Sequence, residues 1–225
     1  MEQYQVTTDW LAARAADTPE AMALLVDGRW WRFDELDALA SRLCARLAAD
    51  GARPGEHVAV LLPNSLAMVV AVFALARLGA VMVPLNTRLT AAEVAWQVAR
   101  ADCARLICAL PTEKQAADAP ASLPRLVLPV DVLAFEAWAA QQPLADPSSA
   151  TGDTPPATLV HPQAIIFTSG TTGYTKGAVI TFANHLWSAV GSAFRLGLVS
   201  GDRWLACLPL YHVGGLAVLF RACLY

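Results

Sequence analysis

The sequence predicts an α/β fold in which layered parallel and mixed sheets are flanked by helices. Its N-terminal half repeats an order of apolar strand, capped helix and apolar strand. These strands are apolar at nearly every position, which is typical of strands that helices bury on both faces. The chain has 225 residues, of which 56% are hydrophobic and 16% charged, so it is expected to form a large core rather than a disordered chain.

The clearest unit covers residues 57–85. HVAVLL at 57–62 predicts a strand, and AVMVPL at 80–85 predicts a second one. Between them, Asn64 or Ser65 can cap a helix, and Gly79 can end it in the left-handed conformation. The apolar run inside this helix is shorter than the roughly 20 residues of a membrane span. We therefore expect a buried helix.

Upstream, Asp27-Gly28 suits a tight hairpin turn between apolar strands at 22–26 and 30–33. Asp34 is then expected to cap a helix that runs to Gly51.

Downstream, Thr90 and Glu93 form a capping box that opens a helix to about Arg100. Short apolar runs at 104–109 and 125–130 predict two further strands.

A linker or surface loop is expected at 141–162, where the chain becomes rich in proline, serine and threonine and loses periodicity. It divides an N-terminal α/β region, 1–140, from a second region, 163–225, that carries the chemistry.

Charge and cysteine content exclude several classes of protein. The net charge of -3 and the scattered basic residues make nucleic acid an unexpected partner. The five cysteines form no CxxC pair and are interpreted as free thiols in a reducing compartment, with no metal assigned to them. Residues 1–10 lack the basic start and apolar run of an export signal.

The most informative segment is QAIIFTSGTTGYTKGAVIT, which predicts a strand at 164–167, a loop at 168–177 and a strand at 178–180. A polyphosphate needs glycines for close backbone approach and hydroxyl or amide donors for its oxygens. Lys176 adds a cation. The glycines are Gly170, Gly173 and Gly177, and the hydroxyl residues are Thr168, Ser169, Thr171 and Thr172.

This loop does not have the P-loop spacing G-x-x-x-x-G-K-[ST], and a strand rather than a helix follows it, which disfavours a kinase-like or GTPase function. From composition alone, a glycine-rich hairpin turn with an incidental lysine is the competing interpretation.

The string TSGTTG-x-x-KG resembles the signature loop of the adenylate-forming superfamily, which includes acyl-CoA synthetases, nonribosomal peptide adenylation domains and luciferases. It departs only at Tyr174-Thr175. The unit around 58–86 and the motif PLYHVGG at 209–215 extend the resemblance over nearly the whole chain. The segments TFANHLWSAVGSAFRLGL and DRWLACLPLYHVGGL are most similar to o-succinylbenzoate CoA ligases of menaquinone biosynthesis, which implies a bacterial cytoplasm.

The resemblance implies that a carboxylate attacks the α-phosphate of ATP and that the thiol of CoA then displaces AMP. Lys176 would neutralise the β- and γ-phosphates, while the hydroxyls and amides of the loop hold the leaving pyrophosphate. Mg²⁺ would share that charge, with Thr172 as its contact.

Four further residues are candidates for the acid substrate. His212 is expected after a strand at 204–208, where its side chain could reach a ligand crevice; by resemblance it lines the acyl pocket, and an ordinary turn histidine is the alternative. Asn184 and Ser188 open an amphipathic helix that also carries His185 and Trp187, a possible core aromatic. Arg195 could pair with a carboxylate, although a solvated arginine is the plainer interpretation.

Family members continue well beyond residue 225, so the resemblance implies an incomplete N-terminal domain that completes neither half-reaction alone. A carrier-protein adenylation domain is the alternative enzyme. The alternatives of another class are a nucleotide-binding module without catalysis and a structural domain whose loop is only a turn.

Overall fold

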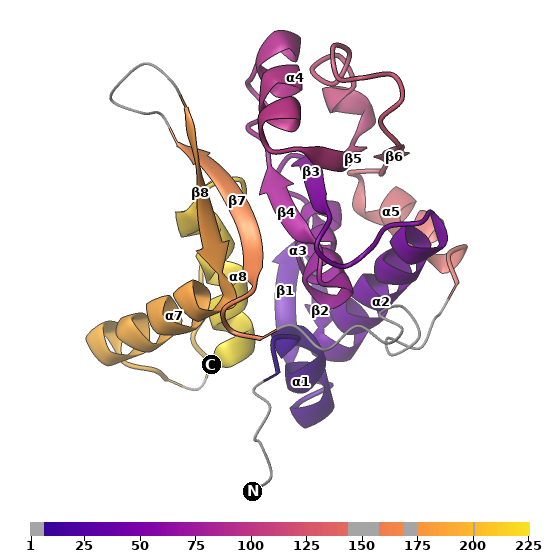
Figure 1. Ribbon diagram of the computed structural model, residues 1–225. Coiled ribbons are helices and arrows are strands. Elements are labelled where there is room, and N and C mark those ends of the chain that lie inside the picture. Colours follow the sequence, from indigo (N-terminus) through magenta and orange to yellow (C-terminus); the bar gives the residue numbers. More distant parts are fainter. Residues whose placement is uncertain (1–6, 144–157, 169–174, 200) are drawn as a thin grey trace, which may run out of the picture.

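The computed structural model describes residues 7–143, 158–168, 175–199 and 201–225 (Figure 1). Helices and strands are interspersed along it. Their bounds are α1 Trp10–Asp17, β1 Met22–Val26, β2 Arg29–Arg32, α2 Phe33–Ala49, β3 His57–Leu61, α3 Leu66–Leu78, β4 Val81–Pro84, α4 Ala91–Arg100, β5 Cys103–Cys108, a 3₁₀ turn Leu110–Thr112, β6 Arg125–Val127, α5 Val132–Ala140, β7 Pro162–Thr168, β8 Lys176–Thr181, α7 Phe182–Leu196 and α8 Val213–Leu224.

Six of the described strands form one mixed sheet in the order β6-β5-β3-β4-β7-β8. Neighbouring strands are parallel from β6 to β7, and β8 returns antiparallel to β7. The predicted α/β fold with a mixed sheet is confirmed. Because β7 pairs with β4 through Ala164 and Met82, the strand that leads into the glycine-rich loop belongs to the same sheet as β3, β4, β5 and β6.

Apolar side chains cover both faces of this sheet. In β3, Val58 and Val60 belong to a larger cluster, whereas Ala59 and Leu61 belong to a smaller one. Helices α1, α2, α3, α5, α7 and α8 contribute to the larger cluster, and α4 contributes to the smaller. The predicted burial of the strands on both faces is confirmed.

Helix α3 forms as expected from its two ends. The Ser65 hydroxyl accepts a hydrogen bond from the Met68 amide at 3.2 Å, and Gly79 ends the helix with a φ of 74°. All 13 of its residues are buried. Among the described helices, none is long and apolar enough to cross a bilayer.

The hairpin of β1 and β2 turns at Asp27-Gly28, with φ of 48° and 79°, as predicted. The expected cap at Asp34 is wrong, because α2 begins at Phe33. The Glu35 carboxylate accepts from the Arg32 amide at 2.9 Å, while the Asp34 carboxylate accepts from the Arg32 guanidinium and, at 2.7 Å, from the Glu35 amide.

The capping box of Thr90 and Glu93 opens α4 as predicted. The strands expected at 104–109 and 125–130 are β5 and β6, although β6 ends at Val127.

The strand expected at 204–208 does not form. Residues 202–207 have no regular secondary structure, and Leu205 is 84% exposed. The segment is held by side chains instead of a strand ladder: the Arg203 guanidinium lies 4.9 Å from the Trp30 ring, and Arg221 lies 5.5 Å from the Trp204 ring.

The cysteines are free, as predicted, and all but Cys207 are buried. Burial raises the pKa of Cys103 and of Cys223 to about 12, which makes these thiols poor nucleophiles at neutral pH. Within the described ranges, no group of three or more His, Cys, Asp or Glu side chains is arranged to hold a metal ion.

Candidate functional site

The β7–β8 hairpin presents the two ends of the glycine-rich loop. Its register runs from Ala164 opposite Ile180 to Thr168 opposite Lys176. Thr168 and Lys176 are both exposed, and the Thr168 hydroxyl donates to the Lys176 carbonyl across a long 3.4 Å. The two predicted strands are confirmed as β7 and β8, which end and begin on either side of the loop residues. The other phosphate candidates, Ser169, Gly170, Thr171, Thr172 and Gly173, lie outside the described residues.

Gly177 is a glycine because its neighbours leave no room for a side chain. A Cβ on Gly177 would lie 2.8 Å from Cγ2 of Ile165 and 3.7 Å from the Phe167 ring. On the same side, the Trp96 ring of α4 meets Phe167 edge-on at 5.9 Å. The end of β7 that leads into the loop therefore contacts α4 through Phe167, and α4 lies toward the same end of the sheet (Figure 1).

Asn184 and Ser188 lie on the first two turns of α7 and have structural contacts. The Asn184 amide oxygen accepts from the Thr181 amide at 2.9 Å and so completes the helix cap. The Ser188 hydroxyl accepts from Arg221 of α8 at 3.0 Å. Arg195 is exposed on the last turn of the same helix. Trp187 is 67% exposed, so its interpretation as a core aromatic is wrong.

His212 is the N-cap residue of α8, where its exposed ring lies 4.6 Å from that of Tyr211. It follows an irregular segment rather than the strand that was expected. Its carbonyl accepts from the Leu216 amide at 2.9 Å, and its amide donates to the Pro209 carbonyl at 3.0 Å. The start of α8 is close-packed, because a Cβ on Gly215 would lie 2.3 Å from the Pro209 oxygen.

Asn64 holds the segment that leads to His212. Its amide nitrogen donates to the Leu208 carbonyl at 3.0 Å, and its amide oxygen accepts from the Leu210 amide at 2.8 Å. The sequence indicates Asn64 only as a possible helix cap, a position that Ser65 takes. No local pattern could show the contact, because the partners lie 144 and 146 residues away.

His185 and Gln163 are buried, and sequence reasoning did not single out their contact. His185 Nε2 lies 3.0 Å from Gln163 Oε1. Burial, and secondarily the charge of Arg221, lowers the pKa of His185 to about 4, so its ring is neutral near pH 7.

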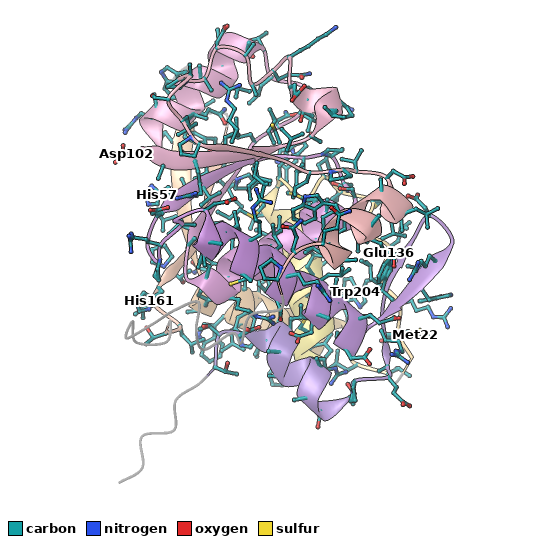
Figure 2. The ribbon with its side chains drawn as sticks, turned by 90° about the vertical axis from the view of Figure 1, so that its right-hand side faces the viewer. Met22, His57, Asp102, Glu136, His161 and Trp204 are labelled. Atoms are coloured by element: carbon teal, nitrogen blue, oxygen red, sulfur yellow. The ribbon has the colours of Figure 1, made fainter. Side chains whose placement is uncertain are left out.

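The two other histidines have structural contacts at the surface. His57 Nδ1 lies 2.6 Å from the Ala101 carbonyl oxygen, and His161 Nδ1 accepts from the Thr158 amide at 2.7 Å. Figure 2 shows His57 beside Asp102, well away from Trp204.

An apolar pocket of about 510 Å³ opens between α7 and α8. Leu186, Phe194, Leu198 and Tyr225 are among its lining residues. The lining contains none of the four substrate candidates, which are Asn184, Ser188, Arg195 and His212.

Comparison with known proteins assigns the family. The sequence model of a family described as "AMP-binding enzyme" matches residues 11–225. The chain belongs to the AMP-binding enzyme family. Curated relatives of this family member include 2-succinylbenzoate–CoA ligases from Bacillus cereus, 36% identical over 218 residues, and from Bacillus mycoides, 34% identical over 217 residues. Both matches cover 96% of the chain and 41% of the relative, so the chain spans about two fifths of the length of these relatives.

Solved structures of the family share this fold. The o-succinylbenzoate coenzyme A synthetase of Bacillus subtilis, in complex with ATP and magnesium ion, superposes with a TM-score of 0.81 at 31% identity, over 96% of this chain and 55% of that one. A fatty acyl CoA synthetase of Mycobacterium tuberculosis gives a TM-score of 0.82 at 25% identity, over 97% of this chain and 43% of that one. The resemblance to adenylate-forming enzymes is confirmed.

Proposed function

We propose that this chain is the N-terminal part of an AMP-forming acid–CoA ligase whose acid is o-succinylbenzoate. The observation that carries the proposal is the family match over residues 11–225, joined to a hairpin that presents exposed Thr168 and Lys176 at the two ends of the glycine-rich loop. The acid is named from relatives at 34–36% identity. The reaction would belong to menaquinone biosynthesis in a bacterial cytoplasm.

In the first step, a carboxylate oxygen of the acid attacks the α-phosphorus of ATP. The bond to the β-phosphate breaks, and pyrophosphate leaves. Negative charge develops on the phosphate oxygens, so the ammonium of Lys176 stabilises the transition state more than the ground state. Thr168 and the loop hydroxyls and amides orient the phosphates, which is where most of the catalysis arises.

In the second step, the CoA sulfur attacks the acyl carbonyl, AMP leaves, and the thiol proton is lost. Mg²⁺ would be held by the phosphates of ATP with Thr172 as a protein contact, and would neutralise phosphate charge.

The acid would be held by residues of α7 and by His212. Arg195 would offer its bidentate fork to the acid from an exposed position. Asn184 and Ser188 already take part in a helix cap and in a hydrogen bond with Arg221, so their part in binding would use the remaining capacity of these groups.

Product analysis of the full-length protein tests the proposal. The protein is incubated with ATP, Mg²⁺, CoA and one acid at a time, and the thioester is identified by mass spectrometry. We expect o-succinylbenzoyl-CoA, and little thioester from benzoate or a fatty acid. An acyl adenylate without any CoA thioester would indicate a carrier-protein adenylation domain and would contradict the assignment of CoA.

A fatty acid is the second candidate substrate, because the Mycobacterium tuberculosis fatty acyl CoA synthetase shares the fold as closely as the o-succinylbenzoate enzyme does. A fatty acyl-CoA as the main product would support this candidate. ATP binding without turnover of any acid would favour a nucleotide-binding module.

A further inference from the structure

A β-bulge interrupts β7 at Gln163. Pro162 lies opposite Thr181 and Ala164 lies opposite Ile180, so two steps along β7 match one step along β8. Gln163 is the additional residue. A bulge bends its strand and redirects a side chain, and bulges occur often beside functional sites.

The bulge directs the Gln163 side chain toward α7. Ile165 and Phe167 pack on the smaller cluster, and strict alternation would place Gln163 on that same face. Instead its Oε1 lies 3.0 Å from Nε2 of His185. The His185 ring lies 4.2 Å from that of Phe220, a member of the larger cluster on the opposite face.

This polar pair is fully enclosed. Gln163 is 0% exposed and His185 2% exposed. The Gln163 Nε2 has no hydrogen-bond partner within the described part of the chain. Because burying an amide with one group unsatisfied offsets much of what the hydrogen bond contributes, the pair is a weak source of stability. Specifying one register among alternatives is the best-attested use of a buried polar group.

We propose that Gln163 and His185 form a register lock that places Thr168 opposite Lys176 at the ends of β7 and β8. If the bulge straightened, every pair between it and the loop would shift by one residue. Phe167 rather than Thr168 would then lie opposite Lys176. The hydrogen bond prevents this shift because it holds Gln163 on the α7 side of the sheet.

The shift would also disturb the packing between the ends of β7 and β8. Gly177 would no longer lie beside Ile165, where only a glycine fits. The inference rests on the proposed function in one respect, which is that Thr168 and Lys176 contact ATP. Gln163 and His185 contact neither of them through any described hydrogen bond, and both are positioning residues.

The register can be read by NMR on the 225-residue chain, without any assay of activity. A cross-strand contact between Ile165 and Val179 reports the native register, and one between Ile165 and Ala178 reports the shifted register. We expect the wild type to show only the contact between Ile165 and Val179.

The variant that removes the lock is Gln163→Leu together with His185→Leu. Replacing both partners by apolar groups of similar size is expected to leave the free energy of unfolding nearly unchanged, so a changed register could not be ascribed to unfolding. We expect this variant to show the shifted contact. A folded double variant with only the native contact would overturn the lock. If the double variant fails to fold, Gln163→Met together with His185→Met provides the same reading, because Met adapts to irregular space in a core.

His185→Gln is the conservative control, because its amide can still bond to Gln163. It should retain the native contact, and a shifted register in this variant would count against the hydrogen bond as the cause.

ATP–pyrophosphate exchange by the full-length protein then measures the effect on the proposed reaction. The double Leu variant should raise KM for ATP on the order of tenfold or more, since misplacement of a binding group by about 1 Å can cost 10²-fold. His185→Gln should stay near wild type, as should Ile107→Val, a matched core substitution in β5.

An unchanged KM in a variant with a shifted register would overturn the positioning role. If the wild type shows no exchange, the proposed function fails, and the NMR contacts still decide whether the lock exists.

Discussion

His185 illustrates how burial sets the charge of a single residue. Enclosed between Gln163 and Phe220 and near Arg221, its ring is held neutral, with a pKa lowered to about 4 from 6.5. An unfolded chain has no such enclosure, so its histidine titrates near the ordinary value. The folded and unfolded states therefore bind different numbers of protons between these two pH values.

The stability of the protein should accordingly fall with acid. Because the folded pKa of His185 is depressed, its contribution is complete above pH 6.5 and is lost as the pH falls toward 4. At about 1.4 kcal/mol for each pH unit, the full effect is at most about 3.5 kcal/mol. Urea unfolding across this range should show a smaller loss in His185→Gln, which does not titrate. Equal losses in both proteins would contradict the account.

Gly177 should tolerate no side chain unless the side chain at position 165 is made smaller. Gly177→Ala places a methyl group 2.8 Å from Ile165 Cγ2, and we expect a destabilisation of about 1–3 kcal/mol, as for overpacking in general. Adding Ile165→Ala should recover part of this loss. A double-mutant cycle by thermal unfolding measures the coupling, and strictly additive effects would show that the two side chains do not compete for space.

At the scale of elements, local signals were sufficient where neighbouring residues decide the structure. Ser65 and Gly79 predicted both ends of α3, and Thr90 with Glu93 predicted the start of α4, because caps depend on residues within one turn. The segment 204–208 was misjudged, since an apolar run becomes a strand only where another strand offers a ladder. Asn64 was missed for a related reason: its partners are distant in sequence.

The start of α8 provides a matched pair of glycines. Gly215→Ala would bring a Cβ to 2.3 Å from the Pro209 carbonyl oxygen, a backbone atom that cannot rotate away. Gly214→Ala would meet only the end of the flexible Leu208 side chain at 3.3 Å. We expect Gly215→Ala to lower the midpoint of thermal unfolding markedly and Gly214→Ala to change it little. Similar effects of the two substitutions would contradict this account of how the helix begins.

At the scale of the whole molecule, Arg77 connects three helices. From α3 it donates to the Asp9 carboxylate at the start of α1, at 2.7 Å, and to the carboxylate of Asp37 and the hydroxyl of Ser41 on α2. Its side chain is 2% exposed. Burial by itself would lower the pKa of Arg77, but the hydrogen bonds and charges of Asp9 and Asp37 outweigh it and raise the pKa.

Replacing Arg77 should therefore destabilise the whole protein. Arg77→Met would leave two carboxylates facing each other without a cation, and breaking a buried ion pair in this way costs about 3–5 kcal/mol. Urea unfolding measures the loss. Arg46→Met removes a partly exposed ion pair with Asp50 and should cost less than about 1 kcal/mol. If Arg77→Met lowered the free energy of unfolding as little as Arg46→Met does, the ion pairs of Arg77 with Asp9 and Asp37 would contribute little to stability.

The sequence also indicated the family, because the loop motif is a contiguous string and the family match spans residues 11–225. It did not indicate how β7 and β8 are held in register, since the bulge at Gln163 arises from pairing between strands and from a contact with α7. The placement of Thr168 opposite Lys176 is thus a property of the fold, while their chemistry is a property of the sequence.

ATP–pyrophosphate exchange tests the central claim most directly, because it isolates attack of a carboxylate on the α-phosphate from the later transfer to CoA. It is measured on the full-length protein with o-succinylbenzoate, benzoate or a fatty acid, and the 225-residue chain is measured beside it. We predict exchange that depends on o-succinylbenzoate, is absent from the 225-residue chain, and falls on the order of 10²-fold or more in Lys176→Ala. Exchange that is equally fast in Lys176→Ala would contradict the assignment of the loop between β7 and β8, and no exchange with any acid would contradict the proposed ligase.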